Sequence, residues 1–174
     1  NRGRFGIYSG DLATAGQYDL WTTDNEFLGW SMASGDVNND GYDDALAGIP
    51  FYGASDSGCV HVYYGRTNAA AEIAQDIALY CPVGENFGSS VAMGNINGDS
   101  YEDLVVGAPN FDDYDADGIG DGRVYVYLGN SIGVPDIPTY SIRAQTYEES
   151  FGWNVSCADF NGDSYDDIII GAPR

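Results

Sequence analysis

The sequence predicts an all-β fold of β-propeller-type blades, with three four-stranded repeats that form part of a larger propeller or of one completed by an oligomer. Three observations support this prediction. One segment recurs without gaps at residues 35–50, 94–109 and 158–173. The residues between these copies repeat as well, and each unit of about 60 residues reads as four short strands. Repeated four-stranded units are typical of propeller blades.

The four strands of a unit can be assigned in chain order. The first, at residues 89–93, follows a Phe-Gly pair and leads into an acidic loop. The second, at residues 104–106, is a continuous apolar run, as expected of a strand covered on both faces. The third, at residues 124–127, is β-branched and aromatic, and the fourth, at residues 140–144, alternates like an outer strand. Only residues 69–78 have the composition of a helical turn.

The repeats divide the chain into units that do not coincide with its ends. Residues 1–26 supply third and fourth strands, residues 27–86 and 87–150 are whole units, and residues 151–174 supply first and second strands. Propellers typically have 4–8 blades, whereas 174 residues make only about three. The chain also begins without Met or a signal peptide. We therefore expect an excised part of a longer chain, or a homo-oligomer in which two copies complete a six-bladed ring.

The chain is strongly acidic, with 27 Asp and Glu residues against 6 Lys and Arg residues and a formal charge of −21. Such a chain repels phosphate backbones and anionic lipid, so we expect no nucleic-acid partner and no binding to membrane surfaces. No apolar run approaches the ~20 residues of a membrane helix, so no membrane insertion is expected. Asp outnumbers Glu, and short Asp side chains in Gly-rich turns are what hard cations require.

Each repeated segment contains an acidic loop with oxygen-bearing residues at positions 1, 3, 5, 7 and 9. Position 6 is Gly or Ser, where the backbone bends, and position 7 offers only its carbonyl. Six or seven hard oxygen donors suit Ca²⁺, whereas Zn²⁺ would want Cys or His and Mg²⁺ would keep more water. The predicted ligands are Asp36, Asn38, Asp40, Tyr42 and Asp44 in the first loop, Asn95, Asn97, Asp99, Tyr101 and Asp103 in the second, and Asp159, Asn161, Asp163, Tyr165 and Asp167 in the third.

These loops are not EF-hands, because position 12 holds Ala47, Val106 or Ile170 instead of Glu and the flanks read as strands. One copy could be a turn that satisfies its own backbone, but three copies favour calcium. The second loop has Asn95 where the others have a charged first ligand, so we expect it to bind most weakly. A fourth acidic loop occurs once and fits a metal site and a solvated loop equally well: Asp113, Asp115, Asp117, Ile119 and Asp121.

These motifs resemble the FG-GAP repeat of integrin α-subunit propellers and related extracellular proteins. Phe87-Gly88 and the Gly-Ala-Pro run at residues 107–109 carry the family name, with the acidic loop between them. In the first unit Leu28 interrupts the Phe-Gly pair, and residues 47–50 read Ala-Gly-Ile-Pro. The resemblance covers nearly the whole chain.

The resemblance implies a seven-bladed propeller in full-length relatives, with Ca²⁺ in the loop between the first and second strands on one rim. There the ions stiffen the blades and take no part in catalysis, and partners dock elsewhere, commonly on the opposite face. Related repeats also occur in fungal lectins and as accessory domains of phospholipase-type enzymes. The resemblance also implies an extracellular, secreted or cell-surface location.

No catalytic residue is expected. His61 lies in an alternating strand without a recognisable catalytic pattern nearby. Trp30 and Trp153 follow the Phe-Gly position, which favours packing over sugar stacking. Cys59 begins a third strand and Cys81 ends the following fourth strand. These ends meet in an antiparallel pair, so a disulfide is expected if the two Cα atoms lie within about 7 Å.

The sequence therefore favours a calcium-binding, non-enzymatic module for adhesion or recognition outside the cell, with a protein or a glycan as its partner. Two alternatives stay open. The first is a lectin-like propeller that binds carbohydrate in aromatic pockets between blades. The second is an accessory domain of a secreted hydrolase whose catalytic part lies elsewhere.

Overall fold

The computed structural model describes residues 3–8, 17–21, 27–53, 55–66, 77–80, 85–112, 121–144 and 150–173. Within these residues all regular elements are strands, and they form two four-stranded and two two-stranded antiparallel sheets. The predicted all-β fold with four-stranded sheets is therefore confirmed. No helix in this part of the chain has the length and apolar character needed to span a bilayer.

Each four-stranded sheet is a meander in which every strand pairs with the next one along the chain. The first sheet contains β3 (Met32–Gly35), β4 (Asp44–Ile49), β5 (Cys59–Tyr63) and β6 (Ile77–Tyr80), in that order. The second sheet contains β7 (Ser90–Gly94), β8 (Asp103–Ala108), β9 (Arg123–Tyr127) and β10 (Tyr140–Arg143), also in chain order. Residues 77–78 belong to β6, so the helical composition of residues 69–78 does not extend a helix into them.

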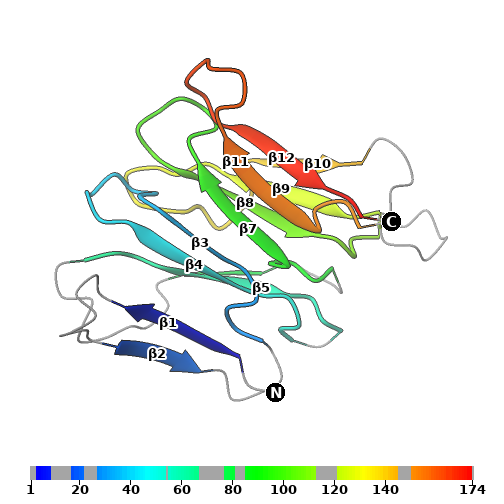
Figure 1. Cartoon of the computed structure of the whole chain (residues 1–174). Coiled ribbons are helices and arrows are strands. Elements are labelled where there is room, and N and C mark those ends of the chain that lie inside the picture. The colour runs from blue at the N-terminus through cyan, green and yellow to red at the C-terminus, as the bar shows by residue number, and fades with distance from the viewer. Residues whose placement is uncertain are drawn as a thin grey trace.

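Two hairpins flank the four-stranded sheets. β1 (Arg4–Tyr8) pairs with β2 (Gln17–Trp21), and β11 (Asn154–Ala158) pairs with β12 (Asp167–Gly171). The four sheets follow one another in space in chain order, from the blue β1–β2 hairpin to the orange and red β11–β12 hairpin (Figure 1). The predicted unit boundaries and the completion of a ring by a second copy stay predictions.

The core lies between consecutive sheets, and alternate residues of one strand face different neighbours. In β8, Leu104 and Val106 pack toward the first sheet, whereas Val105 packs with Val155 of β11. All six residues of β8 are buried, as the continuous apolar run predicts. In β12 the residue corresponding to Val105 is Ile169, which is 49% exposed because no further sheet covers that face within the described residues.

The glycines of the Phe-Gly and Gly-Ala-Pro motifs pair within each sheet and also contact the backbone of a neighbouring sheet. The N–H of Gly88 donates to the carbonyl of Gly107 in its own sheet, at 3.0 Å. A Cβ added to Gly107 would lie only 2.0 Å from the carbonyl oxygen of Gly152 in the next hairpin. A Cβ on Gly48 would likewise lie 2.1 Å from the carbonyl oxygen of Gly88. Glycine is therefore required where the backbones of neighbouring sheets touch.

The alignment of the first unit needs a correction, since Leu28 replaces the motif's Phe and does not interrupt it. Leu28 is buried like Phe87. Gly29 has a φ of 81° and donates its N–H to the carbonyl of Gly48 at 3.2 Å, as Gly88 does to Gly107. The equivalence holds because the buried position requires a large apolar side chain, which leucine provides.

His61 and Cys59 both lie in β5, the third strand of the first sheet. His61 is half-buried in β5 beside Tyr63, with 3.3 Å between its Nδ1 and the Tyr63 hydroxyl oxygen, and burial lowers its pKa to about 4. Cys59 is buried at the register position opposite Tyr80. Cys81 lies outside the described residues, so its disulfide with Cys59 stays a prediction.

Candidate metal-binding loops

The three repeated acidic loops occupy the same place in their sheets, between a first and a second strand. They connect β3 to β4, β7 to β8 and β11 to β12. Each loop is closed by the last register pair of its hairpin, which is Gly35 with Asp44, Gly94 with Asp103, or Ala158 with Asp167. The predicted ligand positions are therefore presented by equivalent turns.

In the first loop the side chains at positions 1, 3 and 5 converge on one turn of backbone. The carboxylate of Asp36 accepts from the N–H groups of Asp40 at 3.1 Å and Gly41 at 2.8 Å. The side-chain oxygen of Asn38 also accepts from the Asp40 N–H, at 2.9 Å. The Asp40 carboxylate accepts from the Asn38 amide at 3.1 Å and from the Tyr42 N–H at 2.9 Å. The turn thus gathers two carboxylates and one amide oxygen.

The third loop repeats this arrangement. The Asp159 carboxylate accepts from the N–H groups of Asp163 at 3.1 Å and Ser164 at 3.0 Å, and Asn161 accepts from the Asp163 N–H at 2.8 Å. The Tyr165 N–H donates to Asp163 at 2.9 Å. Positions 4 and 6 are left-handed in both loops, with φ values of 54° and 89° at residues 39 and 41 and of 81° and 75° at residues 162 and 164.

The second loop differs at position 1, where Asn95 has one oxygen and one amide group. Its oxygen accepts from the Gly98 N–H at 2.8 Å, and its amide group donates to the carbonyl of Asp99. Asn95 therefore does not hold the N–H of Ser100, and Ser100 lacks the positive φ of its counterpart Ser164. Positions 3 and 5 keep the pattern of the other loops. Asp159 also accepts from the position-4 N–H, that of Gly162, at 2.7 Å, so the second loop differs in the contacts of its position-1 side chain with positions 5 and 6.

The position-9 carboxylates lie beneath the loops and bind backbone. Asp44 is fully buried, and its oxygens accept from the N–H groups of Val37 at 3.1 Å and Gly65 at 2.8 Å. Asp103 is also fully buried, and burial raises its pKa. Burial raises the pKa of Asp44 to about 6, and the charges of Asp36 and Asp40 add to this effect. In the third loop Asp167 accepts from the Phe160 N–H at 3.1 Å and is half-buried.

The donor chemistry of these turns fits a hard divalent cation, since every converging atom is oxygen and charged and neutral donors are mixed. In the part of the chain that the structure describes, no three His, Cys, Asp or Glu side chains lie together. A cation in these turns would therefore also use the Asn oxygen at position 3 and backbone carbonyl oxygens. Whether positions 7 and 9 join the converging atoms stays a prediction.

The fourth acidic loop cannot be judged in the same way. Asp113, Asp115, Asp117 and Ile119 lie outside the described residues, so a metal site there stays a prediction. Asp121 is described, and its carbonyl accepts from the Phe151 N–H at 3.2 Å. Asp121 therefore takes part in the junction between the second sheet and the β11–β12 hairpin.

The metal-free chain is expected to lose stability as the pH rises from 4 to 7. The folded pKa of Asp44 is about 6 against an ordinary value of 3.8, so the folded state binds the proton more tightly than the unfolded state. This stabilisation is fully present below pH ~4 and is lost through pH ~6, up to a total of about 3 kcal/mol. Urea unfolding in chelator measures the profile. An Asp44→Asn variant should flatten it, and an unchanged slope in that variant would rule out Asp44 as the cause.

Position 8 is acidic in all three loops, and sequence reasoning missed its role. The N–H of Asn95 donates to the Asp166 carboxylate at 2.8 Å, and the Asp166 N–H donates to the Asn95 carbonyl at 2.9 Å. The Glu102 N–H donates to the Asp36 carbonyl at 3.1 Å. Burial, followed by the charges of nearby carboxylates, raises the pKa of Glu102. The recurrence of an acidic residue at position 8 was the sequence signal that could have indicated this contact between neighbouring loops.

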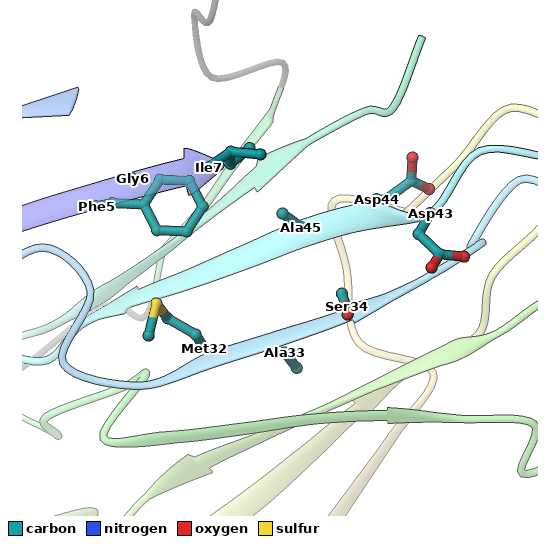
Figure 2. Close-up of a pocket in the computed structure, with 9 residues that line it drawn as sticks. All are labelled: Phe5, Gly6, Ile7, Met32, Ala33, Ser34, Asp43, Asp44 and Ala45. Atoms are coloured by element: carbon teal, nitrogen blue, oxygen red, sulfur yellow. The ribbon is translucent and has the colours of Figure 1, made fainter. Parts of the chain in front are cut away.

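A hollow of about 580 Å³ lies between β1, β3 and β4 (Figure 2). Phe5 and Met32 lie at one end, and Asp43 and Asp44 lie at the other, with side chains that point away from each other. Within the described residues, these two carboxyl groups are the only acidic or basic side chains that line it.

Aromatic rings gather where the loop after β2 meets the turn after β4. Phe27 contacts Trp30 and Phe51, with ring centroids 6.0 and 5.3 Å apart, and Trp30 contacts Phe51 at 5.5 Å. Trp30 is 53% exposed and Trp153 is 54% exposed. Trp30 thus packs edge-on against its neighbours, as expected, while half of its surface faces solvent.

The fold and the loops define a class of protein, a segment of β-propeller built from repeated four-stranded blades with an acidic loop between the first two strands. The FG-GAP repeat model matches residues 28–63, 87–127 and 151–174, more than half of the chain. The chain therefore belongs to the FG-GAP repeat family.

Both an enzyme and integrin alpha subunits are among the proteins to which the chain is similar. The chain is 37% identical over 164 residues to phosphatidylinositol-glycan-specific phospholipase D of Bos taurus, which covers 84% of this chain and 18% of that protein. It is 31% identical over 172 residues to integrin alpha-7 of Mus musculus (95% of this chain, 13% of that protein). It is 33% identical over 159 residues to integrin alpha-PS5 of Drosophila melanogaster (85% and 15%). The chain thus spans less than a fifth of the length of each relative.

Proposed function

We propose that this chain is a calcium-binding, non-catalytic recognition segment of an extracellular propeller. The observation that carries the proposal is the agreement of the first and third loops, which gather the same oxygen atoms with the same backbone conformation. Relatives named as integrin alpha subunits support a role in recognition and a location outside the cell.

In the first loop Asp36, Asn38 and Asp40 would hold the ion, with Tyr42 and Asp44 as the remaining ligands. A bound Ca²⁺ would neutralise carboxylates that otherwise repel one another within a few ångströms. The same side chains already fix the turn through backbone N–H groups, so the ion would bind to a turn that is largely formed. Ion binding would then brace the hairpin that the loop closes.

Titration calorimetry with CaCl₂ tests the proposal. We expect two stronger sites, in the first and third loops, and a weaker one in the second. An Asp40→Ala/Asp163→Ala double variant should lose the two stronger sites. Asp136→Ala is the matched control, since Asp136 is an exposed acid outside the loops. Calcium heats that are absent from the wild-type chain, or retained by the double variant, would overturn the proposal.

Asn95→Asp is expected to raise the calcium affinity of the second loop about tenfold or more. The carboxylate can accept from the position-6 N–H, as Asp36 and Asp159 do, and it adds a charged ligand. Calorimetry of the variant measures the change. Asn161→Asp in the third loop is the control for added charge alone, because position 3 is Asn in every loop. An unchanged second-loop affinity would contradict this account of Asn95.

A second candidate function is an accessory domain of a secreted hydrolase. The resemblance to phosphatidylinositol-glycan-specific phospholipase D supports it. The exposed Trp30, packed against the half-buried Phe27 and Phe51, is in turn the feature that a lectin would use. Calcium-dependent capture of a protein partner supports recognition, whereas glycan-array binding reversed by free sugar supports the lectin. Hydrolysis by this chain alone, abolished by one carboxylate substitution, would contradict every non-catalytic candidate.

A further inference from the structure

The second and third acidic loops are joined through backbone. Asp166, at position 8 of the third loop, holds Asn95, at position 1 of the second loop, by two reciprocal hydrogen bonds of 2.8 and 2.9 Å. One uses the Asp166 carboxylate and the other uses its N–H. We call this pair of contacts the loop clasp. It fixes both backbone polar groups of the residue that opens the second loop.

The first and second loops are joined in a similar way. The N–H of Glu102, again at position 8, donates to the carbonyl of Asp36 at position 1 of the first loop, at 3.1 Å. The Glu102 side chain approaches so closely that a Cβ added to Gly35 would lie 2.1 Å from its carboxylate oxygen. The hydrogen bond from the position-8 N–H to the position-1 carbonyl therefore recurs at both junctions between acidic loops in the described residues. The second bond, from the position-1 N–H to the position-8 carboxylate, is found at Asn95 and Asp166.

The residue that precedes each loop is glycine where a position-8 carboxylate of the next loop approaches it, and alanine where none does so among the residues described. It is Gly35 before the first loop and Gly94 before the second, and a Cβ on Gly94 would lie 2.7 Å from a carboxylate oxygen of Asp166. Before the third loop it is Ala158, and no position-8 acid reaches that residue within the described part of the chain. Glycine occurs where the next loop's carboxylate must approach.

We propose that the loop clasp couples cation occupancy of neighbouring loops, with Asp166 as the positioning residue that carries the effect from the third loop to the second. This inference rests on the proposed calcium binding. Asp166 lies between the predicted ligands Tyr165 and Asp167, so an ion that orders the third loop also orders Asp166. Asp166 then holds Asn95 in place before the second loop binds its ion.

The coupling arises because ion binding to one loop reduces the conformational freedom that the neighbouring loop still has to lose. A loop whose first residue is already fixed loses less conformational freedom on binding, so its affinity rises without a change in its own ligands. By linkage the effect is reciprocal, and occupancy of the second loop raises the affinity of the third by the same factor. Since Glu102 contacts Asp36, the same effect passes to the first loop.

Calcium titrations followed by NMR test the proposal in the whole chain. The amide resonances of Gly98 and Gly162 report separately on the second and third loops. Asp163→Ala disables the third loop without touching the clasp, and we expect it to weaken calcium binding at Gly98 about five- to tenfold. In an Asp166→Ala background the same Asp163→Ala change should leave the Gly98 midpoint unaltered.

Two further variants separate the clasp from general damage. Asp166→Asn keeps an oxygen acceptor for the Asn95 N–H, so this variant should preserve the coupling. Asp136→Ala removes an exposed acid that lies outside the loops. It should leave the Gly98 and Gly162 midpoints unchanged.

The outcomes distinguish this inference from the proposed function. If the amide resonances shift with calcium but the Gly98 midpoint is unchanged by Asp163→Ala, the coupling is overturned and the proposed calcium binding stands. Coupling that persists at full strength in Asp166→Ala, or that is lost in Asp166→Asn, would overturn the role of Asp166. Wild-type amides that do not respond to calcium would overturn the proposed function itself.

Discussion

Replacing Gly107 with alanine is expected to lower the free energy of unfolding by about 3 kcal/mol. The added methyl group would lie 2.0 Å from the Gly152 carbonyl oxygen and 2.4 Å from the Ser90 hydroxyl oxygen. Neither atom can yield easily, because the Ser90 hydroxyl donates to that same carbonyl at 2.8 Å and Ser90 is buried. Overpacking of this kind costs about 1–3 kcal/mol, and disturbing a buried hydrogen bond adds about 1 kcal/mol. Urea unfolding measures the loss.

Gly171→Ala is the matched control for Gly107→Ala. Gly171 holds the same motif position in the β11–β12 hairpin, yet its nearest neighbour to an added Cβ is the Asn154 Cβ at 3.5 Å, an ordinary van der Waals distance. We expect a change within about 0.5 kcal/mol. Equal losses in the two variants would show that intrinsic strand preference, and not contact between sheets, requires these glycines.

Removal of calcium is expected to have the second large effect. At a free concentration 100 times its dissociation constant, an ion stabilises the folded state by about 2.7 kcal/mol. The first and third loops together would then contribute about 5 kcal/mol, equivalent to a shift of at least about 10 °C in melting temperature. Melting curves recorded by circular dichroism in calcium and in excess chelator measure this shift.

The size of the calcium effect should depend on the loop carboxylates. The Asp40→Ala/Asp163→Ala variant is expected to melt at nearly the same temperature with calcium and with chelator. Mg²⁺ should restore less stability than Ca²⁺, since it keeps more of its water. A wild-type melting temperature that is indifferent to chelator would contradict a bracing role for the ions.

The acidic loops were predictable because their contacts are local. The side-chain hydrogen bonds of positions 1, 3 and 5 in the first loop all lie within residues 36–42 and span at most five positions. The spacing of oxygen-bearing residues therefore encodes the turn directly. In the second loop the contacts of Asn95 differ, because an amide group donates where a carboxylate would accept. The weaker calcium binding expected of this loop stays a prediction.

Equivalent sequence positions have different environments once the sheets are packed. Val37 and Phe160 both occupy position 2 of an acidic loop, yet Val37 is fully buried in the core whereas Phe160 is 84% exposed. Leu28 looks like an interruption in the sequence and serves as the motif's buried apolar residue in the structure. Which residue is buried depends on the neighbouring sheet, and the local pattern does not contain that information.

The strands, their order within each sheet and the acidic turns could be predicted from the sequence, because they depend on alternation, turn residues and hydrogen bonds between near neighbours. The packed sheets were needed to show which glycines are indispensable, which apolar residues are covered and that Asp166 holds Asn95. That contact joins residues 71 positions apart. Contacts at such separations form only after two sheets have packed, so they depend on the geometry of packing. In the repeat, their only sequence signal is the acidic residue at position 8.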